Sequence, residues 1–293
     1  MTVPNQRKAT LLALIAVLFW STIGSAFKLT LRQIDFLNIL LYASLVSVVI
    51  FLILLLLQGQ WTSLSKITKK DLLHSALLGL LNPFLFYITV LKAYDLLLAQ
   101  EAIVLNYVWP ITLTLLSVPL LKQKIGYKSI IAILISFIGV IIIVLKGNLT
   151  GLQFTNLQGV ALALICTVFW AVFFIFNMKD PREEVSKMFL NFLFGFLYTL
   201  TAVLVFRKIR IPSPEALAGV VYIGLFEMGI TFILWLKALK LSVTTAKVAN
   251  LIFISPFLSL IWVSFAVGEQ IMGYTIIGLI FIVAGIVLQR VVR

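Results

Sequence analysis

The sequence predicts an all-α membrane protein with ten transmembrane helices in two five-helix inverted repeats and with both termini in the cytoplasm. Of its 293 residues, 62% are hydrophobic and 11% are charged, whereas soluble domains have roughly 45–50% apolar and about 25% charged residues. Apolar runs of the length that crosses a bilayer, about 20 residues, recur along the chain. Several of these runs also occur twice, at a nearly constant spacing.

The apolar runs are typical of helices and not of barrel strands. Residues 50–57 and 130–145 are continuously apolar, whereas the strands of a membrane barrel alternate between apolar and polar residues. A helix satisfies its own backbone hydrogen bonds in lipid, so helical spans are expected. The ten predicted spans cover about residues 9–27, 36–57, 72–91, 97–120, 128–145, 157–178, 188–206, 214–236, 243–265 and 270–289.

The cations predict the orientation of the spans. With the N-terminus inside, the inside connections carry most of the Lys and Arg residues, as the positive-inside rule requires. The cationic connection at residues 207–210 runs against this rule. The net charge of +13 is therefore interpreted as loop charge, and no nucleic-acid partner is expected. Arg7, Lys8 and the IGSA sequence resemble a signal peptide, but no soluble domain follows and the run has a twin later in the chain.

The single cysteine and the single histidine exclude several kinds of site. Cys166 and His74 allow no disulfide within the chain and no metal site built on Cys or His clusters. We expect His74 to lie in a solvated loop. No catalytic residue, metal or cofactor is predicted, although an ion site made of carboxylates alone remains open.

Internal similarity predicts two repeats, residues 9–146 and 157–289. LLALIAVLFWST at residues 11–22 resembles ALALICTVFWAV at residues 161–172, which pairs Trp20 with Trp170. VWPITLTLLSV and ISPFLSLIWVS pair Pro110 with Pro256, and further blocks pair 89–95 with 234–240 and 136–142 with 282–288. An odd number of spans in each repeat inverts the second one. Many secondary transporters follow this plan, with their substrate near the bilayer midplane.

The stretch NYVWPIT at residues 106–112 brings polar groups into an apolar run. Pro110 has no N–H, so the carbonyl of Asn106 loses its helical donor, and Asn106, Trp109 and Pro110 share one side of the helix. A carbonyl, an amide and an indole ring would suit the ammonium and the ring of an aromatic amino acid. Pro256 repeats the kink and Pro83 is a third candidate, although kinks for packing are the alternative.

Glu227 is predicted near the centre of the eighth span, where a charge costs roughly 3 kcal/mol or more. Shifted by 145 residues, it pairs with Asn82. Glu227 is predicted to bind a cationic substrate group, to couple a proton, or to be structural, either protonated or paired with Lys247; these alternatives stay open. Lys247 could instead extend to the membrane surface. Glu101 is expected at the interface, and Gly139 and Gly285 at close helix contacts.

The matched FW pairs, the matched prolines and the Gly268–Glu269 pair resemble the EamA branch of the drug/metabolite transporter superfamily over essentially the whole chain. The first repeat has Lys122–Gln123 in place of the Gly–Glu pair, so no role of that carboxylate carries over to it. NYVWP resembles a stretch of the YddG-type aromatic amino acid exporters, in which aromatic residues line a central cavity. The resemblance implies that Tyr107, Trp109 and Trp170 line such a cavity, with Tyr87 as a looser match.

These observations predict an inner-membrane transporter of a bacterial cell that exports small organic solutes, above all aromatic or other apolar amino acids, by alternating access through a central cavity between the repeats. The expected partners are the solute and the lipid bilayer, in a monomer or weak dimer. The candidate substrate-binding residues are Trp109, Tyr107, Asn106, Trp170, Tyr87, Asn82, Glu227 and Trp20. The alternatives are a carrier of a cationic or nucleotide-linked metabolite, an intramembrane enzyme, and a non-transport membrane protein.

Overall fold

The computed structural model of the chain describes residues 5–59, 64–65, 67–122, 126–148, 155–206, 209–243, 248 and 250–291. Within these ranges the chain is helical, with no β-strand. Seven of the described helices are long and apolar enough to cross a membrane, and three shorter apolar helices join them, at Ile130–Val144, Leu251–Val267 and Gly273–Leu288. The predicted all-α, multi-span membrane protein is thereby confirmed.

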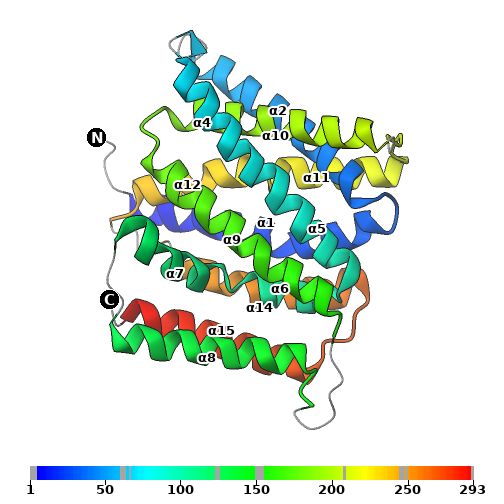
Figure 1. Ribbon diagram of the computed structural model, residues 1–293, viewed down its shortest axis with the longest axis vertical. Helices are drawn as coiled ribbons and strands as arrows, with labels where there is room; N and C mark the ends of the chain where they lie inside the picture. The colour runs from blue at the N-terminus through cyan, green and yellow to red at the C-terminus, as the bar shows by residue number, and fades with distance from the viewer. Residues whose placement is uncertain are drawn as a thin grey trace. The chain divides into compact units, whose positions relative to one another are not determined.

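The chain divides into two compact units, each built from two separate segments (Figure 1). The first unit comprises Met1–Phe84 and Arg182–Val267. In it α2 packs along α10, and α1 contacts α11, α12 and α14. Its helices are α1 (Gln6–Leu31), α2 (Phe36–Leu57), α4 (Lys69–Gly79), α10 (Glu184–Val205), α11 (Pro214–Phe226), α12 (Ile230–Leu241), η2 (Asn250–Ile254), α14 (Ser255–Trp262) and η3 (Val263–Val267), with most of η1 (Leu80–Leu85).

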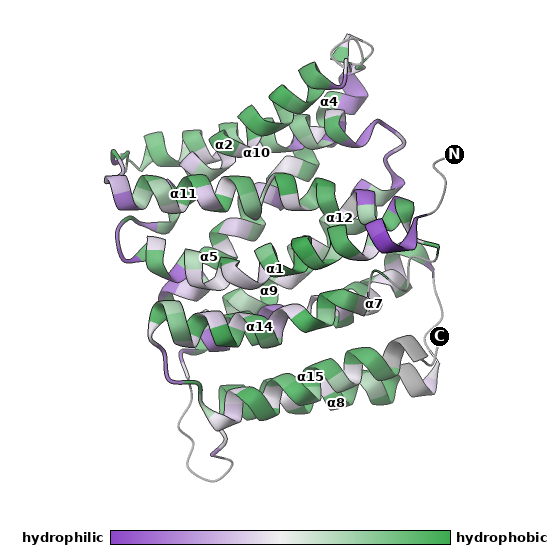
Figure 2. Cartoon of the chain, turned by 180° about the vertical axis from the view of Figure 1, so that it is seen from behind, coloured by the Kyte–Doolittle hydropathy of each residue, from purple (hydrophilic) through white to green (hydrophobic). Residues whose placement is uncertain are grey.

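The second unit comprises Leu85–Pro181 and Gly268–Arg293. Here α8 and α15 run side by side, and α9 contacts α5, α6 and α7 (Figure 1). Its helices are α5 (Phe86–Leu96), α6 (Ala99–Asn106), α7 (Trp109–Leu121), α8 (Tyr127–Val144), α9 (Leu157–Lys179) and α15 (Gly273–Val291). Figure 2 shows that the hydrophobic colour dominates along α8 and α15.

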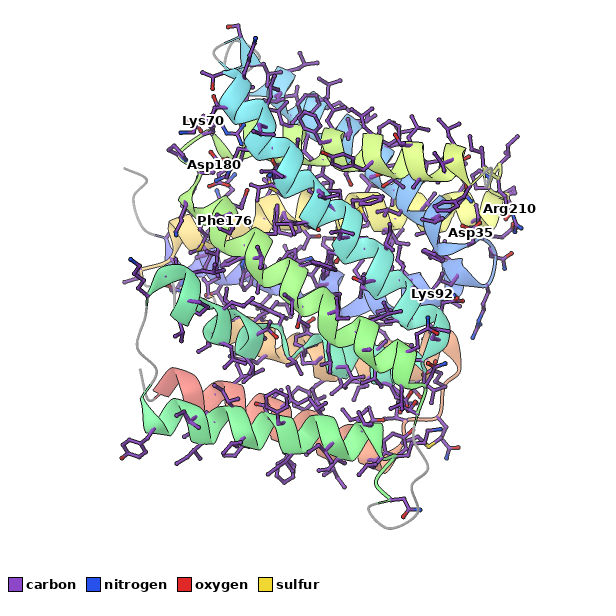
Figure 3. All side chains as sticks on the ribbon, viewed as in Figure 1. Asp35, Lys70, Lys92, Phe176, Asp180 and Arg210 are labelled. Carbon is purple, nitrogen blue, oxygen red and sulfur yellow. The ribbon has the colours of Figure 1, made fainter. Side chains whose placement is uncertain are left out.

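Polar side chains fix where several helices begin. Asp35 accepts hydrogen bonds from the first turn of α2, and Thr68 and Asp71 form a capping box at α4. Asp35 also accepts a hydrogen bond from the Asn38 side chain, whose oxygen accepts one from the backbone N–H of Arg210 (3.1 Å). Figure 3 shows Asp35 and Arg210 close together at this end of the first unit. Arg210, in the connection after α10, is thus held at the start of α2.

Glycine allows the closest helix contacts in the second unit. A Cβ on Gly139 of α8 would lie 2.5 Å from the carbonyl oxygen of Gly278 on α15. A Cβ on Gly285 would lie 2.5 Å from the carbonyl oxygen of Ala132 and would also collide with the Ser136 hydroxyl. Both contacts confirm the prediction that Gly139 and Gly285 serve close packing, because no larger side chain fits.

Several predicted spans are interrupted helices and not continuous ones. The third is divided by the π-helical segment η1, in which Asn82 has extended backbone angles (φ −148°, ψ 119°). Pro83 explains this, because a proline disfavours the α conformation in the residue before it. The eighth is divided by a turn at residues 227–229, between α11 and α12. There the Thr231 hydroxyl donates to the carbonyl of Phe226 (2.5 Å), the last residue of α11.

Candidate substrate site

The fourth span is interrupted at Tyr107 and Val108, between α6 and α7. The N–H of Tyr107 donates to Ile103 (3.1 Å), whereas the N–H groups of Ile111 and Thr112 both donate to Val108 (2.9 and 3.2 Å). None of these hydrogen bonds, which join described residues, has the Asn106 carbonyl as its acceptor. The expectation that Asn106 and Trp109 share one side of the same helix is therefore corrected, because α6 ends at Asn106 and α7 begins at Trp109.

The helix α9 lies against this interruption and pairs with its polar groups. The Cys166 thiol approaches the Asn106 side-chain oxygen at 3.7 Å, and the Thr167 and Thr112 hydroxyls are 2.8 Å apart. About two turns further along α9, the ring of Phe174 lies 6.5 Å from that of Trp109. The Asn106 side-chain oxygen and the Thr112 hydroxyl thus have partners within the second unit, as lipid requires.

An aromatic cluster joins α9 to α5. The Trp170 ring lies 5.2 Å from that of Phe86, which meets the Tyr87 ring edge-on at 4.8 Å. Tyr87 is fully buried, whereas Trp170 is half-buried, as are Tyr107 and Trp109. Five of the predicted site residues therefore lie on α5, α9 and the α6–α7 interruption, which are neighbours in one unit: Asn106, Tyr107, Trp109, Trp170 and Tyr87.

The other three predicted residues lie in the first unit. Trp20 of α1 contacts two rings of α12, Phe232 at 5.8 Å and Trp235 at 5.4 Å. Glu227 follows the last residue of α11 and is half-buried. Asn82 is fully buried, and neither its amide nitrogen nor its amide oxygen has a hydrogen-bond partner in the part of the chain that is described. An unsatisfied buried group of this kind costs about 1–3 kcal/mol, which makes Asn82 the most unusual polar residue of this set.

The three candidate kink prolines occupy two kinds of position. Pro110 and Pro256 lie in the first turns of α7 and α14, where a missing N–H leaves no hydrogen bond unmade. Pro83 lies inside η1 and packs against Gly195 of α10. The predicted partner Lys247 lies outside the described residues.

Sequence reasoning missed a buried polar network at the start of α6. Glu101, expected at the interface, is 1% exposed and accepts hydrogen bonds from Thr155 (2.9 Å) and Tyr274 (3.1 Å). Its neighbour Gln100 is also fully buried, and both side chains bond residues at the start of α15. The Gln–Glu pair that opens an apolar run was the available signal. Among the described residues no group of three His, Cys, Asp or Glu could hold a metal ion.

Comparisons with known proteins place this architecture. A model of the EamA-like transporter family matches residues 7–145 and 157–290. A protein described as an uncharacterized transporter of Archaeoglobus fulgidus is 24% identical over 96% of both chains, and another, of Clostridium kluyveri, is 27% identical over 97% of this chain and 93% of its own.

Two further matches add to this. A protein of Acidianus ambivalens, described as an uncharacterized transporter in the sor 3′ region, is 33% identical over 61% of this chain and 70% of its own. A crystal structure of another protein superposes with a TM-score of 0.65, at 21% identity and over 98% of both chains, which shows the fold. The family model covers nearly the whole chain, and the chain therefore belongs to the EamA-like transporter family.

Proposed function

We propose that this transporter exports small organic solutes, with aromatic or other apolar amino acids as its substrates, by alternating access between helices of the two repeats. One observation carries the proposal: at the α6–α7 interruption, half-buried Tyr107 and Trp109 adjoin the Asn106 carbonyl, against α9. An ammonium group is attracted to carbonyl oxygens and aromatic faces. An aromatic side chain stacks on indole or phenol rings.

The eight residues divide into two roles in this proposal. In the second unit, Trp109, Tyr107, Trp170 and Tyr87 form apolar walls, and Asn106 binds the charged end of the amino acid. In the first unit, Trp20 offers an apolar wall, and Asn82 and Glu227 offer polar groups to the substrate. The buried amide of Asn82 has no hydrogen-bond partner among the described residues, which supports its proposed role in binding a polar group of the substrate. The resemblance of NYVWP to the YddG-type exporters supports the aromatic substrate.

We propose ten spans with both termini in the cytoplasm, in the inner membrane of a bacterial cell. The two segments that match the family model support repeats at 9–146 and 157–289. The three shorter apolar helices supply the spans beyond the seven long ones. In this arrangement the interruptions at Pro83 and just before Pro110 in the first repeat, and the turn at residues 227–229 in the second, give each repeat non-helical backbone, as many transporters have at their sites.

A second candidate function is the transport of a cationic or nucleotide-linked metabolite, with Glu227 as the proton-coupling carboxylate. The position of Glu227 at the turn between α11 and α12 favours it, because ionisable residues within membrane spans face a cavity or a partner and often serve as proton relays.

Counterflow in proteoliposomes tests both functions. Vesicles are loaded with unlabelled solutes, and the entry of labelled tryptophan, phenylalanine, threonine, methionine, and cationic or nucleotide-linked solutes is followed with and without a pH gradient. Exchange of aromatic amino acids that is lost in Trp109→Ala supports the first function. Exchange of cationic or nucleotide-linked solutes alone, sensitive to Glu227→Gln, supports the second and refutes the first.

A further inference from the structure

The carboxylate of Glu269 caps a helix that lies far away in the sequence. Its Oε1 accepts a hydrogen bond from the backbone N–H of Ala99 (2.8 Å), and its Oε2 accepts one from that of Gln100 (3.3 Å). These are two of the N–H groups that a helix start leaves without internal partners. A negative charge also interacts favourably with the helix dipole at this end. Leu98, which precedes α6, offers no side-chain cap of its own.

The side chain of Gln100 completes the connection between α6 and α15. Its oxygen accepts hydrogen bonds from the N–H of Met272 (2.8 Å) and the hydroxyl of Thr275 (2.9 Å). Its nitrogen donates to the carbonyl of Gln270 (2.9 Å) and approaches Glu269 (3.5 Å). The two N–H donors of the Gln100 amide thus each have an acceptor, and its oxygen accepts two hydrogen bonds. We call these contacts of Glu269 and Gln100 the α6 latch.

The latch holds one end of a short, stiff element whose other end carries a candidate site residue. The eight residues of α6 span about 12 Å. The helix ends at Asn106, whose side-chain oxygen contacts the Cys166 thiol of α9. A movement of Ala99 and Gln100 is therefore transmitted along one hydrogen-bonded helix to Asn106.

We propose that Glu269 and Gln100 are positioning residues, which hold α6 so that Asn106 stays against α9. The part of this inference that concerns solute binding rests on the proposed function, whereas the effect on Asn106 does not. Glu101 reinforces the same end, because Thr155 and Tyr274 bind its carboxylate.

The chain contains its own reporter for this movement. Cys166 is the single cysteine of the sequence and is fully buried, so a thiol reagent reacts with it only when α9 separates locally from the helices packed against it, α6 among them. We expect Glu269→Ala to raise the rate of Cys166 modification by N-ethylmaleimide about tenfold, as the loss of a helix cap predicts. Glu269→Gln, which keeps one acceptor oxygen, should give a smaller rise, and so should Gln100→Ala.

Two controls distinguish a local effect from general loosening. Glu215→Ala removes an exposed carboxylate from the first turn of α11 and should leave the rate unchanged. Ala16, fully buried in α1, matches Cys166 in the repeat alignment. A protein with Ala16→Cys and Cys166→Ala reports on the first unit, and Glu269→Ala should not change its rate.

The inference is overturned if N-ethylmaleimide modifies Cys166 at the parental rate in both folded variants, Glu269→Gln and Gln100→Ala. It is also overturned if Glu269→Ala raises the reaction rate of the introduced thiol in the Ala16→Cys, Cys166→Ala protein by the same factor. Should Glu269→Ala fail to fold, these two milder variants decide. A faster Cys166 reaction in a protein that exchanges no amino acid leaves the latch valid and refutes the amino acid substrate. Amino acid exchange that depends on Trp109, with unchanged rates of Cys166 modification, refutes the latch and supports the amino acid substrate.

Discussion

The surroundings of α1 in the first unit and of α9 in the second are two versions of one arrangement. Each helix opens a proposed repeat and packs against the third and fourth spans of the other repeat: α1 against α11, α12 and α14, and α9 against α5, α6 and α7. Trp20 contacts two rings of α12, and its match Trp170 contacts Phe86 of α5. The same packing is therefore built twice from exchanged segments.

The two versions differ at the helix that carries the matched proline. Tyr107 and Trp109 of the second unit correspond to Phe253 and Ser255 of the first. In the second unit the Asn106 side-chain oxygen and the Thr112 hydroxyl contact polar groups of α9. In the first, the buried hydroxyls of Ser25 and Ser255 have no hydrogen-bond partner within the described residues. The repeat thus preserves packing, while the polar and aromatic chemistry differs between the units.

The largest expected effect comes from removing the indole ring at one of the matched positions. We expect Trp109→Ala to weaken the exchange of aromatic amino acids by roughly 10- to 100-fold, because a lost stacking contact costs about 1–3 kcal/mol. Ser255→Ala, at the matched position, should change it less than about twofold, since no ring is lost. Counterflow measures both, and equal effects would contradict the assignment of the stacking role to the second unit.

Substitution of Glu227 in the first unit should have the next largest effect on exchange. If Glu227 couples proton movement, Glu227→Gln should slow exchange about tenfold and abolish its dependence on pH, since the amide carries no titratable proton. The exposed Glu215 of the same helix α11 provides the control, as Glu215→Gln should retain the parental rate and pH profile. A Glu227→Gln protein with full rate and an unchanged pH profile would exclude proton coupling through this residue.

Close packing of helices should respond in both units. We expect Gly195→Ala, whose Cβ would collide with Pro83, and Gly285→Ala, whose Cβ would collide with Ser136, each to lower the free energy of unfolding by about 1–3 kcal/mol. Gly126→Ala has no atom within 4 Å of the new Cβ and serves as the control. Thermal unfolding in detergent measures the three, and a stable Gly195→Ala would show that η1 can shift away from α10.

The smallest expected difference concerns two tyrosine hydroxyls. Tyr274 donates to the carboxylate of Glu101 in the second unit, whereas Tyr222 pairs with the Thr22 hydroxyl in the first. Hydrogen bonds to charged groups contribute about 1.5–3 kcal/mol and neutral ones about 0.5–1.5 kcal/mol. Tyr274→Phe should therefore lower the stability more than Tyr222→Phe does in the same unfolding assay, and the reverse order would place the stronger bond in the first unit.

Sequence reasoning located much of the candidate site but not its geometry. The break in the NYVWPIT helix followed from Pro110, because a proline acts on its own backbone and on nearby residues. The grouping of Asn106, Tyr107, Trp109, Trp170 and Tyr87 in one unit, apart from Asn82, Glu227 and Trp20, did not follow. That grouping depends on which helices pack together, and a linear pattern of apolar residues does not encode their exchange between the units.

The sequence by itself determined the helical membrane architecture, because the length and polarity of a run decide whether it can cross a bilayer. It also determined the matched prolines and the close contacts of Gly139 and Gly285. Only the tertiary structure decided that Glu269 caps α6 and that Glu101 is buried between Thr155 and Tyr274. Those contacts join residues 54 to 173 positions apart, and hydrogen bonds over such separations exist only once packing has brought the helix ends together.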